Sequence, residues 1–428
     1  MSVEVGPLGV DVLKVLILGL LGAAAALAAH AGAAVYQDGL RTSVPELWRG
    51  GRDRRALAAF SYTISIGFIV AYALPYSLAT GIVIIHIVLL TIDTIGLRFR
   101  RRAMAVVVGF LYAAFATIGI DLFVSLVRST RGYASGIDQL FAPLAYTFPL
   151  LAPVAIANHY GPRWGAVSAL ATVIIWRLAE IIAHGGGLLG PLTPGGGAIA
   201  LVVMTAVAVL PALRASASPV VDSAMYEGGV RRLRSHWPLL VAPPILIAIA
   251  ASQGWLAGEP AQLVLLGVGS PSAAAAVALF SMVGFVPMIA ISGLLSGVWN
   301  QDGYPDWYLA AGYVLPNPIL AGLAGLALIV VELGTLRAVG NLLNTRPRIH
   351  GLGSAVRDAL DSVPTLTILA GGLVASVGLA GTLGAVVVVG SYTMNESKGR
   401  PVMPIAVPVF AFLAVTLAVR AGVAAGVM

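Results

Sequence analysis

The sequence predicts an all-α polytopic membrane protein with about 11 to 14 transmembrane or re-entrant helices. Of its 428 residues, 59% are hydrophobic and only 10% are charged, and the mean hydropathy is +0.94. A soluble domain carries about 25% charged residues, so this chain has more apolar surface than a water-soluble core can bury. Its apolar runs are long and continuous rather than alternating, which favours helices over a closed β-barrel.

Apolar segments follow one another along the whole chain. A spanning helix needs roughly 20 residues, and several of these segments are long enough to hold two elements. They lie at 9–35, 56–75, 78–97, 103–126, 139–158, 164–184, 195–213, 237–253, 262–299, 307–339, 361–394 and 402–428.

A polar stretch at 214–235 divides the chain into an N-terminal membrane half, residues 1–213, and a C-terminal membrane half, residues 236–428. Short loops rich in arginine face the cytoplasm in multi-pass proteins, which predicts that this stretch is a cytoplasmic linker in a protein of the cell (inner or plasma) membrane. The loops of this kind are 36–55, 98–102, 214–235 and 337–357. The acidic N-terminus does not resemble a cleaved signal peptide, so we expect the first apolar segment to remain as a helix.

The sequence also predicts a two-fold internal repeat with helical hairpins. A shift of 302 positions lays Asp93 on Asn395, and uncharged runs of 37 and 34 residues precede the two, at 56–92 and 362–395. Two complete spans and a turn need about 40 residues or more. The alternatives are therefore short helices or hairpins that enter the membrane and return. The segments "ALPYSLATG" and "GLAGTLG" suit the tips of such hairpins, because they contain helix breakers.

Several strings of residues, in this order along the chain, resemble the YhfT family of bacterial inner-membrane proteins. The resemblance implies a membrane protein of the transporter type, and it supplies no substrate and no chemistry. The strings are "AHAGAAVYQDGLRTSVPEL" at 29–47, "TIDTIGL" at 91–97, "GFVPM" at 284–288, "LPNP" at 315–318 and "MNESKGRPV" at 394–402.

Ionisable side chains within apolar segments are the candidates for function, because a charge at mid-membrane costs at least about 2.5–3.5 kcal/mol. Asp93 follows the apolar run that contains His86, and seven residues place the two on one helix face. Asp93 is a candidate carboxylate for a coupling ion or proton. The alternative is a carboxylate at the membrane interface that pairs with an arginine of the loop 98–102.

Asn395, Glu396 and Ser397 form the second candidate site, since their oxygens in a row suit a hard cation or a polar substrate. The alternative is an ordinary cytoplasmic loop marked by Lys398. Asn317 lies between two prolines, where an unwound segment would expose backbone carbonyls and where a simple turn is the alternative.

Arg177 and Glu180 share one face of an apolar segment at the spacing i, i+3. They are interpreted either as a buried ion pair that locks helices together or as a substrate-facing arginine balanced by a carboxylate. Glu332 is expected to pair with Arg337 at the cytoplasmic end of its helix, and Asp121 to lie near the outer surface.

The leading functional hypothesis is a secondary transporter, coupled to protons or sodium, that moves a small polar or anionic metabolite, and whose hairpins work as an elevator. No motif of a soluble enzyme is present, no cofactor or metal site is indicated, and cysteine is absent. The partners expected are the small molecule, the coupling ion and the lipid bilayer, not nucleic acid, and a homodimer is compatible with the sequence. The alternatives are a phosphotransferase-like permease that needs a partner, a channel, and a structural membrane subunit.

Overall fold

The computed structural model describes residues 11–41, 43–48, 51, 53–185, 190–219, 221–300 and 305–425. Among these residues ten helices are long and apolar enough to cross a membrane. A further pair, Tyr226–Ser235 and Trp237–Ser252, meets at a bend of 70° and raises the number to 11 if it forms one broken span. The prediction of an all-α protein with many membrane-spanning helices is confirmed.

The elements of the first half include short strands and half-helices between the long helices. They are α1 (Val12–His30), β1 (Ala34–Val35), α2 (Asp38–Arg41), α3 (Val44–Trp48), α4 (Arg54–Phe68), the π-helix η1 (Ile69–Ala73), α5 (Leu74–Thr80), β2 (Val83–Ile84), α6 (Ile85–Arg98), α7 (Arg102–Arg128), α8 (Tyr133–Thr147), the 3₁₀-helix η2 (Phe148–Leu150), α9 (Leu151–Tyr160), α10 (Pro162–His184) and α11 (Pro194–Arg214).

The second half begins after a short 3₁₀-helix in the linker. Its elements are η3 (Ser223–Met225), α12 (Tyr226–Ser235), α13 (Trp237–Ser252), β3 (Leu256–Ala257), α14 (Pro260–Gly267), α15 (Pro271–Ser296), β4 (Trp299–Asn300), α16 (Pro305–Val314), α17 (Pro318–Asn344), α18 (Pro347–Ser397), η4 (Pro404–Ala406) and α19 (Val407–Ala424).

The two halves share an order of elements, apart from α2 and α3 in the first half and α14 in the second, so the chain contains an internal repeat. In each, a helix leads into a strand, and a second helix, a second strand, a half-helix and a helix of 27 residues follow. The corresponding pairs are α1 and α13, β1 and β3, α4–α5 and α15, β2 and β4, α6 and α16, and α7 and α17. The predicted shift of 302 positions is wrong, because it would lay α6 on the end of α18 instead of on α16.

Four glycines explain why the helices break at equivalent places. Gly32 and Gly254 precede β1 and β3, and Gly81 and Gly297 precede β2 and β4. Their φ angles are 64°, 67°, 82° and 65°, in the left-handed region that glycine enters without a steric penalty. A left-handed glycine commonly ends a helix, so the sequence terminates each helix in the same way in both repeats.

The strands pair between the halves rather than within them. β1 pairs with β4 and β2 pairs with β3, both in parallel. The side chain of Lys14, at the start of α1, donates a hydrogen bond of 2.7 Å to the carbonyl of Gly81 beside β2, whereas α13 ends at β3. Since α1 and α13 pack together, they run in opposite directions, and the repeat is inverted. Inverted repeats are a common construction of membrane transporters.

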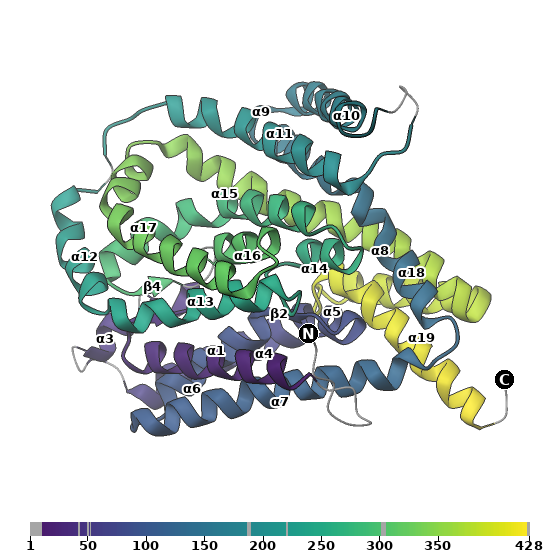
Figure 1. Cartoon of the computed structure of the whole chain (residues 1–428), viewed down its shortest axis with the longest axis horizontal. Helices are drawn as coiled ribbons and strands as arrows, with labels where there is room; N and C mark the ends of the chain where they lie inside the picture. The colour runs from purple at the N-terminus through teal and green to yellow at the C-terminus, as the bar shows by residue number, and fades with distance from the viewer. Residues whose placement is uncertain are drawn as a thin grey trace.

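The helices form two bundles, and the chain passes through each of them twice (Figure 1). The strand bundle contains the strands with α1–α7 and α13–α17, and the hairpin bundle contains α8–α11, α18 and α19. Within the first, α1 packs against α6, α7 and α13, and α13 packs against α16 and α17. Within the second, α18 packs against α8, α9 and α19. The bundles meet where α15 contacts α11 and α18, and where α5 contacts α19.

The hairpin bundle takes its name from two sharp turns. One lies at Gly161, between α9 and α10, and the other lies inside α18, where Ala380 and Gly381 leave the helical conformation. After the second turn the chain comes back on itself, so that Gly384 lies against the Ser376 carbonyl. The predicted hairpin tip "GLAGTLG" is therefore where α18 turns.

Candidate functional site

A pocket of about 210 Å³ that contains several charged and polar side chains lies between the two bundles. Its lining comes equally from both sides of that interface. The strand bundle supplies Phe68, Tyr72, His86, Glu259 and Phe285, and the hairpin bundle supplies Arg357, Leu360, Asp361, Met403 and Ile405. Small-molecule sites are usually concave and largely apolar, with a few convergent polar groups, and this pocket has that composition.

His86 is the second residue of α6, directly after β2. It is buried, with its ring between the aromatic rings of Phe68 and Tyr72 at centroid distances of 4.9 and 5.7 Å. Nδ1 of the imidazole has no hydrogen-bond partner in the part of the chain that the structure describes. A buried ring nitrogen of this kind is available to a ligand in the pocket.

Glu259 follows β3, the strand that pairs with β2, and lines the pocket together with His86. It immediately precedes α14, and its carboxylate accepts a hydrogen bond from the Tyr72 hydroxyl. Because β2 and β3 run in parallel, the half-helices α6 and α14 both begin at the same edge of this pair. Helix N-termini carry partial positive charge and attract anionic groups.

Arg357 and Asp361 form the charged wall on the hairpin bundle. They lie one turn apart on α18, and the Arg357 guanidinium donates a hydrogen bond to the carbonyl of Gly284 on α15, across the interface between the bundles. Arg357 is half-buried and Asp361 is exposed, so the pocket opens on this side.

Asp93 does not line the pocket, although it lies on the same helix as His86. It is buried, and its Oδ2 accepts hydrogen bonds of 2.8 Å from the backbone amides of Tyr36 and Gln37. The ring of Tyr36 meets that of His86 edge-on at 5.2 Å. Asp93 thus holds the segment after β1 in place, and through Tyr36 it supports the His86 ring.

The segment around Asn395 is an ordered turn that leads into the pocket. The Asn395 side chain both donates to and accepts from the backbone of Val402, at 2.8 and 3.0 Å, and thereby closes the turn before Met403. Glu396 pairs with Arg400 at 2.8 Å, which raises the pKa of Arg400 above its usual value. The hydroxyl of Ser397 donates to the carbonyl of Met394. None of the three predicted residues, Asn395, Glu396 and Ser397, lines the pocket itself.

The predicted residues Arg177 and Glu180 both hold the chain that joins α10 to α11. Arg177 donates to the carbonyl of Gly190 at 2.6 Å. Glu180 is buried and accepts hydrogen bonds from the amide and the hydroxyl of Thr193, and its other oxygen lies 3.2 Å from His184 Nδ1. These contacts fit the structural interpretation of the two side chains better than the substrate-facing one.

Three further sequence-based assignments are resolved by the packing. Asn317 is the N-cap of α17, where its side chain accepts from the amides of Ile319 and Leu320. The expected pairing of Glu332 with Arg337 is wrong, because Arg337 lies 3.7 Å from Glu227 and Glu332 is buried against Tyr308. Asp121 forms an ion pair of 2.5 Å with Lys14, near Gly81.

Sequence reasoning missed Tyr72, Glu259, Arg357 and Asp361. Glu259 is an isolated acid between two apolar runs, which is the signal that identified Asp93, but it lies next to a proline and resembles a turn residue. Arg357 lies at the end of the arginine-rich segment 337–357, for which the sequence predicts a cytoplasmic loop, although the residue belongs to α18. The packing of α14 and α15 against α18, and of η1 against η4, brings these groups to one place.

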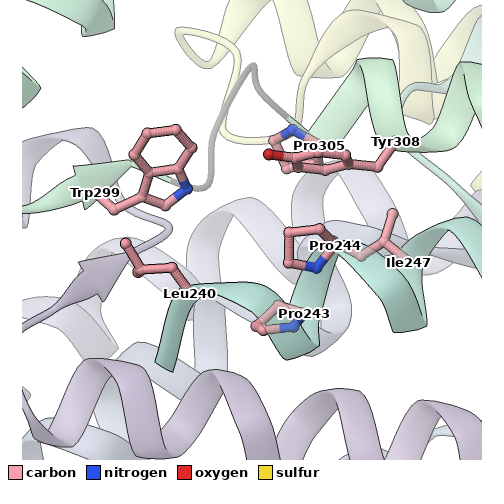
Figure 2. A pocket seen from close by; sticks show the side chains of 7 residues that line it. All are labelled: Leu240, Pro243, Pro244, Ile247, Trp299, Pro305 and Tyr308. Carbon is pink, nitrogen blue, oxygen red and sulfur yellow. The ribbon is translucent and has the colours of Figure 1, made fainter. Parts of the chain in front are cut away.

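Two other hollows are unsuited to the same role. Figure 2 shows a void where Leu240, Pro243, Pro244 and Ile247 of α13 face Trp299, Pro305 and Tyr308. Its volume is about 10 Å³, close to the least that holds one water molecule. A groove of about 550 Å³ between α18 and α19 is mostly apolar, and Asn395 and Lys398 are part of its lining.

The fold and the pocket define a helical, multi-pass membrane protein with an inverted repeat and a small polar site between its two bundles. The chain belongs to the YhfT family, described as "Protein of unknown function", which matches residues 14–425. It is similar to "Uncharacterized protein YhfT" of Escherichia coli (strain K12), with 27% identity over 419 residues that cover 94% of this chain and 95% of that protein. No solved structure matches the chain.

Proposed function

We propose that the protein is a secondary transporter that carries a small polar or anionic metabolite through the pocket between its two bundles. The observation that carries this proposal is the position of the pocket, at the broken helices of an inverted repeat and on the interface of two separately packed bundles. Transporters commonly bind their substrate where discontinuous helices meet, at the interface of inverted repeats.

The lining favours a small anion, such as a short carboxylate or a phosphate. Arg357 and the buried imidazole of His86 offer hydrogen-bond donors, and the N-termini of α6 and α14 add partial positive charge. Glu259 and Asp361 offer acceptors for hydroxyl or ammonium groups on the same molecule. The volume of about 210 Å³ lies below the usual range for drug-sized ligands, about 300–1,000 Å³, so the substrate is small.

Alternating access would come from movement of the strand bundle against the hairpin bundle, as in an elevator. Two hydrogen bonds of 2.6 Å join the bundles, from Tyr76 to the carbonyl of Ile405 and from Tyr133 to that of Ala79. Asp361, in the lining of the pocket, is exposed, so the pocket is open at this residue. We propose that this open side faces the cytoplasm, since α18 begins beside the arginine-rich loops.

The coupling ion is a proton or sodium in this proposal, and the membrane is the inner, or plasma, membrane of a bacterium. Asp93 and Glu396 are less suited to carry that ion than the sequence indicated. The first is engaged by two backbone amides and the second by Arg400, and neither lines the pocket.

The test is uptake into proteoliposomes of radiolabelled lactate, succinate and inorganic phosphate, with neutral glycerol as the comparison, under a proton or a sodium gradient. Uptake of at least one anion, well above protein-free liposomes, is expected. Arg357→Gln should lower it at least about tenfold, because a hydrogen bond to a charged group contributes about 1.5–3 kcal/mol.

The matched control is Arg214→Gln, which removes an exposed arginine at the end of α11 and should leave uptake unchanged. Gradient-independent ionic currents would instead indicate a channel. Full uptake by Arg357→Gln, with the protein correctly folded, would remove the pocket from the transport path.

A further inference from the structure

A second polar cluster lies on the far side of Gly258 from His86. Asp306 is the second residue of α16, just as His86 is the second residue of α6, so the two occupy equivalent positions in the inverted repeat. Gly258 lies beside both: it follows Ala257, which pairs with Ile84 two residues before His86, and any Cβ at this position would lie 2.6 Å from Asp306 Oδ1. The pocket and this acid are therefore separated by a single residue.

The Asp306 carboxyl group is buried and accepts a hydrogen bond. Its Oδ1 accepts from Gln262 Nε2 at 2.8 Å. The Gln262 oxygen in turn accepts from the Gly258 amide and from the Tyr313 hydroxyl, at 3.1 and 3.0 Å. This ring of contacts fixes the orientation of the Gln262 amide, which therefore presents its NH₂ group to the acid.

No lysine, arginine or histidine forms an ion pair with Asp306 in the described part of the chain. The titratable groups around it are Tyr313 on its own helix, Glu259 before α14, and His86 across Gly258. Glu332 on α17 lies behind α16, where Tyr308 donates to it. A buried carboxyl group without a cationic partner favours its protonated form, because desolvation penalises the charge.

We propose that Asp306 binds the proton that is coupled to transport, and that Gly258 links its protonation to the occupancy of the His86 pocket. The inference rests on the proposed function and selects the proton over sodium. A hard cation requires a shell of oxygen ligands, whereas Gln262 presents a donor nitrogen to this carboxyl group.

The first experiment does not depend on transport. Infrared difference spectra of the full chain in lipid nanodiscs, recorded between pH 5 and pH 9, should show a titrating carbonyl band of a protonated carboxylic acid. Asp306→Asn should remove this band, and Glu332→Gln, which removes another buried acid, should retain it. A band that persists in Asp306→Asn would overturn the proposal.

If Asp306→Asn does not fold, Gln262→Leu keeps the acid and removes its donor. The carboxylate then loses a stabilising contact, so the band should titrate at higher pH than in the unmodified protein. An unchanged titration would contradict the assignment.

The second experiment separates this inference from the proposed function. In proteoliposomes Asp306→Asn should lose proton-driven accumulation of the anion identified above and should retain its exchange across the membrane without a gradient. Accumulation equal to that of the unmodified protein would overturn the inference alone. Absence of both activities in the unmodified protein would overturn the proposed function, and the infrared result would still stand by itself.

Discussion

The hydroxyl group of Tyr76, on α5, donates a hydrogen bond of 2.6 Å to the carbonyl of Ile405, and this contact joins the strand bundle to the hairpin bundle. Both residues are fully or almost fully buried. Ile405 also lines the pocket, so the bond lies beside it, and the bond from Tyr133 to Ala79 is a second contact of the same kind between the bundles. Any motion that separates the bundles at this place has to break the Tyr76 bond.

The first prediction is that Tyr76→Phe favours the outward-open state. A hydrogen bond contributes about 1 kcal/mol, so the population open on that side should rise up to about fivefold. The chain contains no cysteine, so Leu360→Cys provides a single thiol in the pocket. Its reaction with a membrane-impermeant maleimide, added from outside intact cells, measures this population.

Tyr160→Phe is the matched control for that measurement. The Tyr160 hydroxyl also bonds a backbone carbonyl, that of Ala208, but both residues belong to the hairpin bundle. Labelling of Leu360→Cys should therefore be the same with and without the Tyr160→Phe substitution. Equal labelling rates in all three proteins would show that the Tyr76 bond does not restrain the opening.

The second prediction concerns the glycines that end the helices. Gly81→Ala should lower the stability by about 1–2 kcal/mol, since its φ of 82° is left-handed and a Cβ there meets only an ordinary contact with Val124. Thermal unfolding in one detergent measures the change. Gly119→Ala, in the middle of α7 with open space around it, should be neutral or slightly stabilising. Equal losses of stability in Gly81→Ala and Gly119→Ala would contradict an origin in the left-handed backbone conformation of Gly81.

The third prediction concerns the ion pair of Lys14 and Asp121, whose side chains are only 7% and 11% exposed. Removing one partner of a buried pair leaves a charge without compensation and costs about 3–5 kcal/mol. Lys14→Met and Asp121→Asn should therefore each destabilise the protein strongly in thermal unfolding. The double variant should be closer to the parent than the two losses added together, and strict additivity would argue against coupling.

The fourth prediction is that Asn395 organises the turn before the pocket. Asn395→Ala removes both contacts to Val402, so the segment between α18 and α19 should become more sensitive to limited proteolysis, and anion uptake should fall. Ser397→Ala, two residues away and exposed, loses only a contact within the helix and serves as the control. Equal proteolysis of both variants would refute the role of Asn395.

Composition and periodicity were sufficient to predict the class of the fold, because a chain with 10% charged residues must satisfy its backbone within helices in a bilayer. The helix breaks were also readable in principle. Gly81 and the string "GLAGTLG" lie where the chain leaves the helical conformation. His86 was recognised as a candidate since an imidazole is conspicuous in an apolar run.

The register of the repeat and the partners of each polar group came only from the tertiary structure. A shift of 302 positions matched similar local patterns, but helix pairing follows three-dimensional packing, and the strands pair between the halves. Glu259 and Arg357 are 98 positions apart in the sequence, and both line the pocket because α14 and α15 pack against α18. Local sequence determines where a helix begins and ends, whereas the partners of a buried charge depend on contacts between distant segments.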